Sequence, residues 1–358
     1  MKVGILTYIG TQSHGCCLQA YALKSLLEAQ GVDAEIVNYH CREIDWAVKG
    51  CKLPKNRKGI KKKIGSALRL PILSKRWDKF KAFETEYLGI NYPEFKVDNP
   101  ERYDYFVVGS DQVWNTDING GDLTFFLDFT DDSKKKLTYA ASLGLDEFPE
   151  KYRDRCYELI SDFSRLYVRE QSLKDLLLNY DNKLSVTRVL DPTLVLPREK
   201  WKSFIGSRPV KDKYLFVHLP QQGKDVMDKI KKIAEERNLK VIYASTPIKR
   251  IDGVVCKWTV SPTEYLNYMY YADIVVTGSF HSLCFSIIFN KEFYCTASMI
   301  AERATRLTNL MEMAGCGDRL LTNYESLQGK TVDSKLYENL DMYRDISAKA
   351  IKDMCESL

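Results

Sequence analysis

The sequence alternates short apolar runs with segments of helical apolar spacing, and it does so in two successive series. The runs expected as buried strands are 2–7, 34–39, 103–108, 136–142, 165–169, 186–191, 214–219, 241–245, 274–276 and 291–295. The segments expected as helices are 15–29, 77–87, 152–163, 172–178, 224–237, 261–271, 282–290, 301–313 and 334–357. Strands that alternate with helices indicate parallel sheets covered by helices. The sequence therefore predicts an α/β protein built from two successive α/β halves of similar design.

The chain length also favours two domains. With 358 residues, the chain is longer than one hydrophobic core usually serves. The best candidate for a boundary is the stretch 196–210, which contains Pro197, Arg208 and Pro209. We therefore predict an N-terminal domain over 1–196 and a C-terminal domain over 211–330, followed by a helical segment over 331–358.

Composition narrows the functional classes. With 45% hydrophobic and 28% charged residues the chain has the composition of a soluble globular protein. No window approaches the roughly 20 apolar residues of a membrane-spanning helix, and the apolar run at the N-terminus is too short for a signal peptide. The ten cysteines are scattered and include no C-x-x-C pair, so neither a metal site nor a redox motif is expected. We expect a cytoplasmic protein.

One basic stretch, 49–81, interrupts the N-terminal domain. It holds 13 lysines and arginines against the single acid Asp78. It lacks a recognisable nucleic-acid-binding module and has few aromatic residues, so binding to nucleic acid is not expected. Interleaved apolar residues such as Ile64 and Leu68 favour an amphipathic face that contacts an anionic membrane. A solvated basic helix explains the same pattern equally well.

The segment 274–291 reads as a buried strand, a turn and a helix. Ser279 is placed to cap the helix, so that the first-turn N–H groups point outward and favour an anion. His281 lies at this turn, where a titratable imidazole beside an anion site indicates proton-transfer chemistry. An ordinary buried histidine would explain the position equally well.

Other loops at strand ends carry polar residues. Loop 109–115 follows a buried strand and contains Ser110, Asp111 and Asn115, which are placed to contact a ligand or only to fix turns. Arg169 ends another strand, where its guanidinium can bind a carboxylate or phosphate, or pair with the adjacent Glu170. The loop after the first strand lacks G-x-G-x-x-G, so a dinucleotide cofactor is not expected.

Several segments match one known family in order and at similar spacing. They are G-I-L-T-Y (4–8), G-C-C-L-Q-A-Y-A-L (15–23), V-G-S-D-Q-V-W-N (108–115), Y-A-A-S-L-G (139–144), V-R-E (168–170), L-D-P-T-L (190–194) and S-F-H-S-L-C-F-S-I-I-F-N-K (279–291). Together they span nearly the whole chain. On this ordered set the chain resembles the polysaccharide pyruvyl transferase family.

The resemblance implies a GT-B-like fold, with two Rossmann-like domains facing across a cleft and the C-terminal helix returning to the first domain. It implies transfer of a pyruvyl group from phosphoenolpyruvate onto sugar hydroxyls as a ketal, during cell-surface polysaccharide synthesis. Phosphoenolpyruvate would be a substrate, and no cofactor is expected. The acceptor would be a sugar or a lipid-linked glycan, which places the protein at the inner face of the cell membrane.

The resemblance also implies roles for single residues. His281 corresponds to the family's catalytic acid or base, and Arg169 to an arginine linked to the donor. Apart from these two carried-over positions, our own hypothesis is that Ser279, Ser282 and Arg303 or Arg306 assist in binding the donor. The acceptor is expected to face Gly15, Ser110, Asp111 and Asn115.

The chain departs from the family pattern at the histidine segment. Characterised relatives often carry R-L-H-G there, with an arginine that contributes to donor binding. Here Phe280 precedes His281, Ser282 follows it, and the segment has no arginine. Two alternatives therefore stay open: a glycosyltransferase that uses a nucleotide-sugar, and a non-catalytic relative that has kept the fold.

Overall fold

The computed structural model describes residues 1–44, 70–91, 100–219, 224–244, 250–296, 301–321 and 335–356. The chain divides into two compact units. The first unit comprises Met1–Leu53, Phe80–Leu196 and Met342–Leu358, and the second comprises Pro54–Lys79 and Pro197–Asp341. The basic stretch was expected to belong wholly to the N-terminal domain. Instead its described residues 70–79 belong to the second unit, and 49–69 lies outside the described residues.

The first unit contains a parallel sheet in the order β2-β1-β3-β4, continued by the parallel pair β5-β6. The strands are β1 (Lys2–Leu6), β2 (Asp33–Ile36), β3 (Tyr105–Val108), β4 (Lys136–Thr138), β5 (Leu166–Val168) and β6 (Val186–Arg188). Backbone hydrogen bonds from Thr138 to Arg165 and from Arg169 to Ala141 connect the β4 segment to β5. The strand order reverses between β1 and β3, and this is the position at which open α/β sheets bind ligands.

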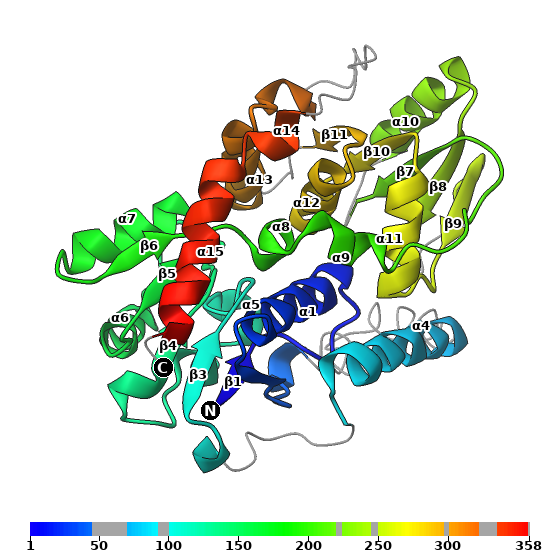
Figure 1. Ribbon diagram of the computed structural model, residues 1–358. Coiled ribbons are helices and arrows are strands. Elements are labelled where there is room, and N and C mark those ends of the chain that lie inside the picture. The colour runs from blue at the N-terminus through cyan, green and yellow to red at the C-terminus, as the bar shows by residue number, and fades with distance from the viewer. Residues whose placement is uncertain are drawn as a thin grey trace, which may run out of the picture. The chain divides into compact units, whose positions relative to one another are not determined.

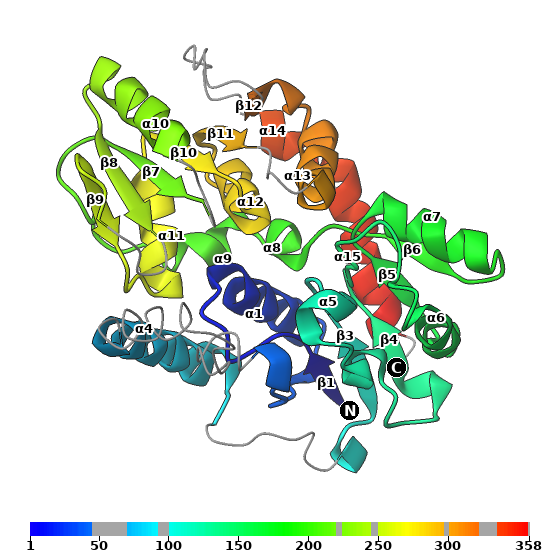
Figure 2. The same cartoon turned by 180° about the vertical axis from the view of Figure 1, so that it is seen from behind.

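Helices of the first unit connect these strands. The helices are α1 (His14–Glu28), α5 (Thr116–Asn119), α6 (Arg153–Ser161), α7 (Gln171–Tyr180), α8 (Pro192–Val195) and α15 (Asp341–Glu356). The C-terminal helix α15 runs along β5 in both views (Figures 1 and 2). Ser347 of α15 accepts a hydrogen bond from the backbone N–H of Leu190, at 2.8 Å. The end of the chain is therefore part of the first unit.

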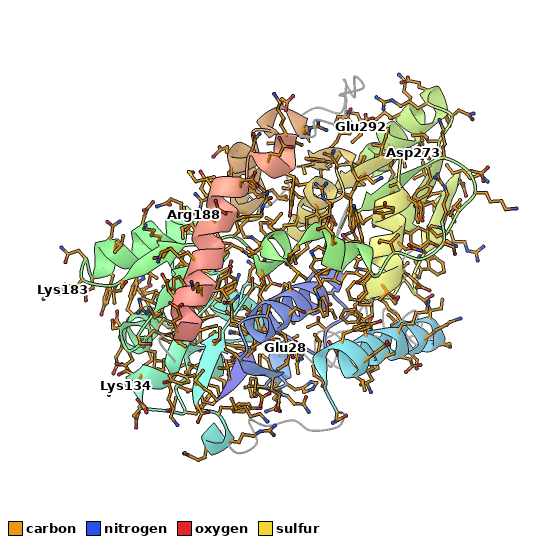
Figure 3. All side chains as sticks on the ribbon, viewed as in Figure 1. Glu28, Lys134, Lys183, Arg188, Asp273 and Glu292 are labelled. Atoms are coloured by element: carbon orange, nitrogen blue, oxygen red, sulfur yellow. The ribbon has the colours of Figure 1, made fainter. Side chains whose placement is uncertain are left out.

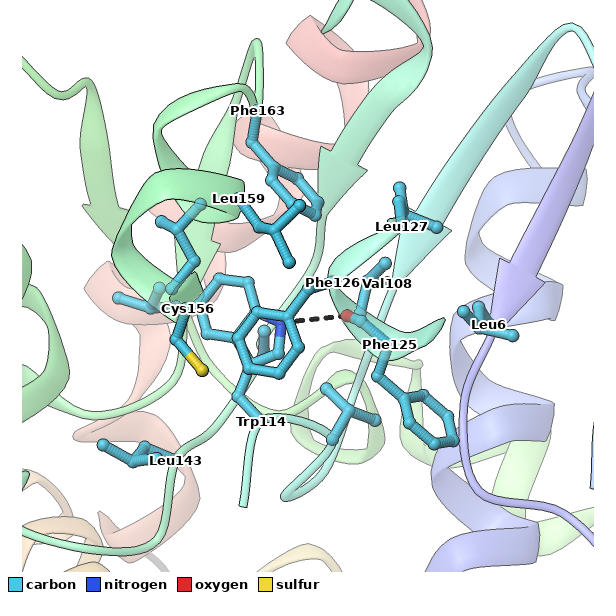
Figure 4. Packing of buried hydrophobic residues seen from close by; sticks show 14 of the residues in the cluster. Leu6, Val108, Trp114, Phe125, Phe126, Leu127, Leu143, Cys156, Leu159 and Phe163 are labelled. Carbon is cyan, nitrogen blue, oxygen red and sulfur yellow. Dashed lines mark hydrogen bonds between the residues drawn. The ribbon is translucent and has the colours of Figure 1, made fainter. Parts of the chain in front are cut away.

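Trp114 lies at the centre of the first unit's hydrophobic core (Figure 4). It is fully buried, stacks on Phe126 with ring centroids 5.6 Å apart, and donates its indole N–H to the carbonyl of Phe125 at 3.0 Å. Because this tryptophan lies within the loop after β3, the packing of its side chain anchors the loop 109–115.

The second unit has one six-stranded parallel sheet in the order β12-β11-β10-β7-β8-β9. The strands are β7 (Tyr214–His218), β8 (Lys240–Ala244), β9 (Val254–Lys257), β10 (Ile274–Thr277), β11 (Glu292–Thr296) and β12 (Leu320–Leu321). This is the order of a doubly wound Rossmann sheet, and it reverses between β7 and β10. The sequence patterns missed the edge strands β9 and β12, which are short.

Helices cover both faces of this sheet. They are α9 (Arg198–Lys202), α10 (Lys224–Glu236), α11 (Pro262–Tyr271), α12 (Phe280–Ile288), α13 (Ala301–Ala314) and α14 (Lys335–Glu338). Alternate residues of β7 point to the two faces of the sheet. Leu215 belongs to the hydrophobic cluster that includes residues of α10, whereas Phe216 contacts the rings of Tyr265 and Tyr268 on α11. Figure 2 shows α10 and α11 on opposite faces. The predicted capping box at Ser261 is present and opens α11.

The predicted α/β class is thus confirmed, with parallel sheets in both units. Helix α4 (Leu70–Phe83) crosses from the second unit into the first at Lys79. Charged side chains such as Lys134 and Lys183 project outward at the periphery (Figure 3). No helix in the described ranges is long and apolar enough to cross a membrane.

Candidate active site

The segment predicted to carry the chemistry lies at the point where the second sheet reverses its strand order. Strand β7 ends at His218 and β10 ends at Thr277, and these two residues are partners in the parallel register. Thr277 donates its hydroxyl to the carbonyl of His218 at 2.9 Å, and the N–H of Gly278 reaches the same carbonyl at 3.3 Å. The turn after β10 is therefore fastened to the end of β7.

Helix α12 begins at Phe280, two residues earlier than its apolar spacing predicts. Ser279 occupies the N-cap position, but its side chain makes no capping hydrogen bond, so the expected capping role is wrong. Instead the backbone N–H of Ser279 donates to Thr277 Oγ1 at 2.9 Å. The turn is held by the threonine that ends the strand, because that hydroxyl lies directly beneath the turn.

His281 lies in the first turn of α12, with 8% of its surface exposed. Its ring meets that of Phe280 edge-on, with centroids 5.4 Å apart. His218 Nδ1 lies 2.7 Å from the hydroxyl of Ser282, the residue that follows His281, so the two histidines belong to one site. The structure therefore places the predicted histidine at the end of the strands, where ligands of doubly wound sheets bind.

The site residues predicted from the sequence do not include His218, yet it is hydrogen-bonded into a chain with two buried side chains. His218 Nδ1 lies 2.7 Å from Ser282 Oγ, and the hydroxyl of Tyr265 lies 2.6 Å from the same oxygen. Ser282 is completely buried and Tyr265 nearly so. The signal in the sequence was the position of His218 at the end of a buried strand, because ligand sites are expected at strand ends.

His218 is held in its neutral form. Burial, the charge of Arg76 and the charge of His281 lower the pKa of His218 from its ordinary value of 6.5 to about 4. A neutral imidazole has one donor and one acceptor nitrogen, so the chain from Tyr265 through Ser282 can run in either direction. Burial raises the pKa of the Tyr265 hydroxyl, which therefore keeps its proton.

Arg76 supplies positive charge to this site from the basic stretch. It lies on α4, is 3% exposed, and donates from Nη1 to the backbone carbonyl of Trp258 at 3.1 Å. Its effect on the pKa of His218 shows that its charge reaches the end of β7. The histidine segment itself has no arginine, and the second unit places this one nearby from a distant part of the chain.

The two other arginines expected to assist lie on α13. The side chain of Arg303 lies outside the described residues, and Arg306 is half-buried. Their expected contact with the donor stays a prediction.

In the first unit, the loops after β1 and β3 meet where that sheet reverses. Thr7 donates its hydroxyl to the carbonyl of Ser110 at 3.0 Å, and the Cys16 thiol lies 3.4 Å from Asp111 Oδ2. Gly15 is buried in the first turn of α1. Asn115 caps α5 by accepting from two backbone N–H groups, which is the turn-fixing role that was one of its two interpretations.

Arg169 is 6% exposed and lies among carboxylates and a hydroxyl of its own unit. Nε donates to Glu170 at 2.9 Å, Nη1 to Asp191 at 3.1 Å, and Nη2 to the hydroxyl of Ser142 at 3.0 Å. Asp111 lies 3.7 Å from Nη1. These contacts include the pairing with Glu170, one of the two interpretations from sequence, and leave the donor role as a prediction.

The arginine cluster, defined as Arg169, Asp111, Ser142, Glu170 and Asp191, connects loops that follow four neighbouring strands. Ser110 joins it through Asp191, to which its hydroxyl donates at 3.0 Å. Among the described residues, no group of three or more His, Cys, Asp or Glu side chains is arranged to hold a metal ion. The cluster therefore orders the loop ends mainly through charge-assisted hydrogen bonds.

Several solved structures are similar to this chain at low identity. The Staphylococcus aureus MnaA–UDP co-structure matches with a TM-score of 0.49 and 12% identity, covering 99% of this chain and 91% of that one. The Methanocaldococcus jannaschii UDP-GlcNAc 2-epimerase complex with UDP-GlcNAc and UDP has a TM-score of 0.45 and 15% identity, covering 97% and 93%. A mutant of the Thermobaculum terrenum O-GlcNAc transferase matches with a TM-score of 0.46 and 13% identity, and the match covers 99% of this chain and 68% of that one.

Among curated proteins, none matches the sequence. A family profile does match: the one described as Polysaccharide pyruvyl transferase covers residues 14–298. This range includes the loop after β3, the arginine cluster and the histidine segment. The chain belongs to the polysaccharide pyruvyl transferase family and is a transferase.

Proposed function

We propose that this protein transfers the pyruvyl group of phosphoenolpyruvate onto two hydroxyls of a sugar, forming a ketal. The observation that carries the proposal is the pair His281 and His218 at the strand-order reversal of the second unit, in a chain of this family. A doubly wound sheet binds its ligand at that point, and histidine transfers protons near neutral pH. The cation Arg76 favours an anionic donor there.

The proposed reaction balances with the donor and a sugar diol alone. A proton adds to the methylene carbon of phosphoenolpyruvate, and the first sugar oxygen bonds to the adjacent carbon as its own proton leaves. The second sugar oxygen then bonds to that carbon, the carbon–oxygen bond to phosphate breaks, and phosphate departs with the second hydroxyl proton. His281 is assigned the proton transfers, as acid to the methylene carbon and as base to a hydroxyl.

His218 is assigned a positioning role in this scheme. Because it stays neutral, it adds no positive charge that would change with pH near neutrality. The hydrogen bond between His218 and Ser282 fixes the His218 ring against the first turn of α12. Ser282 directly follows His281 in the sequence. Ser279 and the N–H groups after it are assigned to the donor's anionic groups.

The first unit is assigned to the acceptor, a sugar or lipid-linked glycan of cell-surface polysaccharide synthesis. The loops with Gly15, Ser110, Asp111 and Asn115 are its proposed contacts. Peripheral contact of the basic stretch 49–81 with the inner face of an anionic membrane would bring the protein to a lipid-linked acceptor. Sedimentation with anionic vesicles that weakens as salt rises supports this contact, and no sedimentation at low salt contradicts it.

The test compares donors and then removes the histidine. Phosphoenolpyruvate is expected to raise the melting temperature of the wild type and to release phosphate with glycosides that carry neighbouring hydroxyls. His281→Asn is expected to lower that rate by about 100-fold or more, because proton transfer is lost. His40→Asn, in the first unit, is the matched histidine control and should keep activity. Stabilisation by UDP-N-acetylglucosamine alone would instead favour a nucleotide-sugar glycosyltransferase, and full activity of His281→Asn would contradict the role of that histidine.

A further inference from the structure

We propose that a pocket in the second unit, between α4 and the segment from β9 to α11, binds a carboxylated saccharide. The pocket has a volume of about 600 Å³, within the range of small-molecule sites. Its walls come from Ile72 and Lys75 of α4, from Lys257 and Trp258 after β9, and from Tyr268 of α11. These residues all belong to the second unit.

The charge of the pocket favours an anion. Three lysines line it. Lys79 is paired with Glu264, the one acidic lining residue, at 2.6 Å, and Glu264 is also used in the capping box of α11. Lys75 and Lys257 have no ion pair within the ranges that the structure describes. Two ammonium groups therefore have no carboxylate partner in the described part of the chain and can bind a carboxylate from a ligand.

Trp258 adds a flat surface to the pocket. Its ring, with Tyr268 and Ile72, offers an apolar wall. Two cations and an aromatic surface together suit a sugar ring that carries a carboxylate.

The choice of a saccharide over other anions rests on the proposed function, in which the acceptor is a polysaccharide. The pocket wall is also connected to the site at the end of β7. Arg76 donates to the carbonyl of Trp258, and its charge is one of the causes that lower the pKa of His218. An acidic sugar unit held here would be a second anchoring point for an acceptor chain.

The test is calorimetric titration of the full-length protein with tri-galacturonate, in the absence of phosphoenolpyruvate. We expect saturable binding that weakens with salt and falls by about tenfold in Lys75→Gln/Lys257→Gln, because charge-assisted contacts are lost. Trp258→Ala removes the aromatic wall and should weaken binding by about threefold. Lys200→Gln/Lys202→Gln changes the net charge equally on exposed residues of α9 that do not line the pocket, and should bind as the wild type does.

Four outcomes would overturn the proposal. They are no saturable binding at millimolar concentration, equal binding of the methyl ester of tri-galacturonate, equal weakening by the α9 control, and lysine-dependent binding of UDP or inorganic phosphate that displaces the saccharide. Because binding is measured without donor or turnover, loss of pyruvyl transfer in the donor experiment would leave this result standing. Conversely, pyruvyl transfer by a protein that binds no saccharide would overturn the proposed saccharide site and leave the proposed function standing.

Discussion

The neutral state of His218 makes a single half-buried residue sensitive to acid. Its side chain contacts Ser282 and the Tyr265 ring, whose centroid lies 5.3 Å away, and the charge of Arg76 acts on it. Protonation of His218 would add a positive charge to a site on which Arg76 already acts. The residue is therefore both a member of the site and a source of pH-dependent stability.

We expect the free energy of unfolding to fall as pH drops from about 6.5 to 4. The pKa of His218 is about 4 in the folded protein and 6.5 ordinarily, so the unfolded chain binds one more proton in that window. The loss is at most about 3 kcal/mol. His218→Asn removes this titration, so urea unfolding at several pH values should show a shallower acid dependence than the wild type. Identical pH slopes for the two proteins would contradict the assignment.

At the scale of elements, the arginine cluster joins the loops after β3, β4, β5 and β6. Each strand of the first sheet is short, between three and five residues, so few ladder hydrogen bonds fix the strand ends. The hydrogen bonds of Arg169 to Glu170, Asp191 and Ser142 hold the loops after these strands together instead. The loop that carries Asp111 is thereby fixed relative to its neighbours.

We expect Arg169→Met to lower the free energy of unfolding by about 3–5 kcal/mol near neutral pH, because buried carboxylates lose their cation. The deficit should shrink as the carboxylates are protonated in acid. Arg155→Met is the control: Arg155 pairs with Glu158 on an exposed helix face, and its loss should change stability little. Urea unfolding provides both values. Unchanged stability of Arg169→Met together with a raised KM for phosphoenolpyruvate would instead indicate that Arg169 binds the donor.

At the scale of the whole molecule, each unit has its own hydrophobic core, and the chain returns to the first unit at its end. The first core surrounds Trp114, and the second lies between α10 and the sheet. Helix α15 follows the entire second unit in sequence yet buries Ile351 and Met354 in the first. The stability of the first unit thus depends on residues at both ends of the chain.

Two isoleucines of α15 test this dependence. Ile351 is 2% exposed, whereas Ile346 on the same helix is 41% exposed. We expect Ile351→Ala to cost about 2–4 kcal/mol and Ile346→Ala to have little effect, because only the first leaves a cavity. Urea unfolding followed by tryptophan fluorescence, to which buried Trp114 contributes, measures both. Equal effects would show that α15 does not pack as described.

The sequence alone determined the elements and the place of the histidine. Apolar periodicity is a local property, so it located most strands, the capping box of α11 and the turn that carries His281, to within a few residues. The alternation of strands and helices also indicated two α/β domains. The ordered family segments indicated the family. The facing of the two domains across a cleft, the donor and the acceptor stay predictions.

Only the tertiary structure decided which side chains meet. The partners His218 and Ser282 are 64 residues apart, Arg169 and Asp191 are 22 apart, and Arg76 reaches Trp258 across 182 residues. Periodicity carries no information on the order of parallel strands, because each strand buries the same apolar pattern whichever neighbour it pairs with. The order of the sheet, and with it the neutral histidine, the arginine cluster and the lysine-lined pocket, follows from long-range packing.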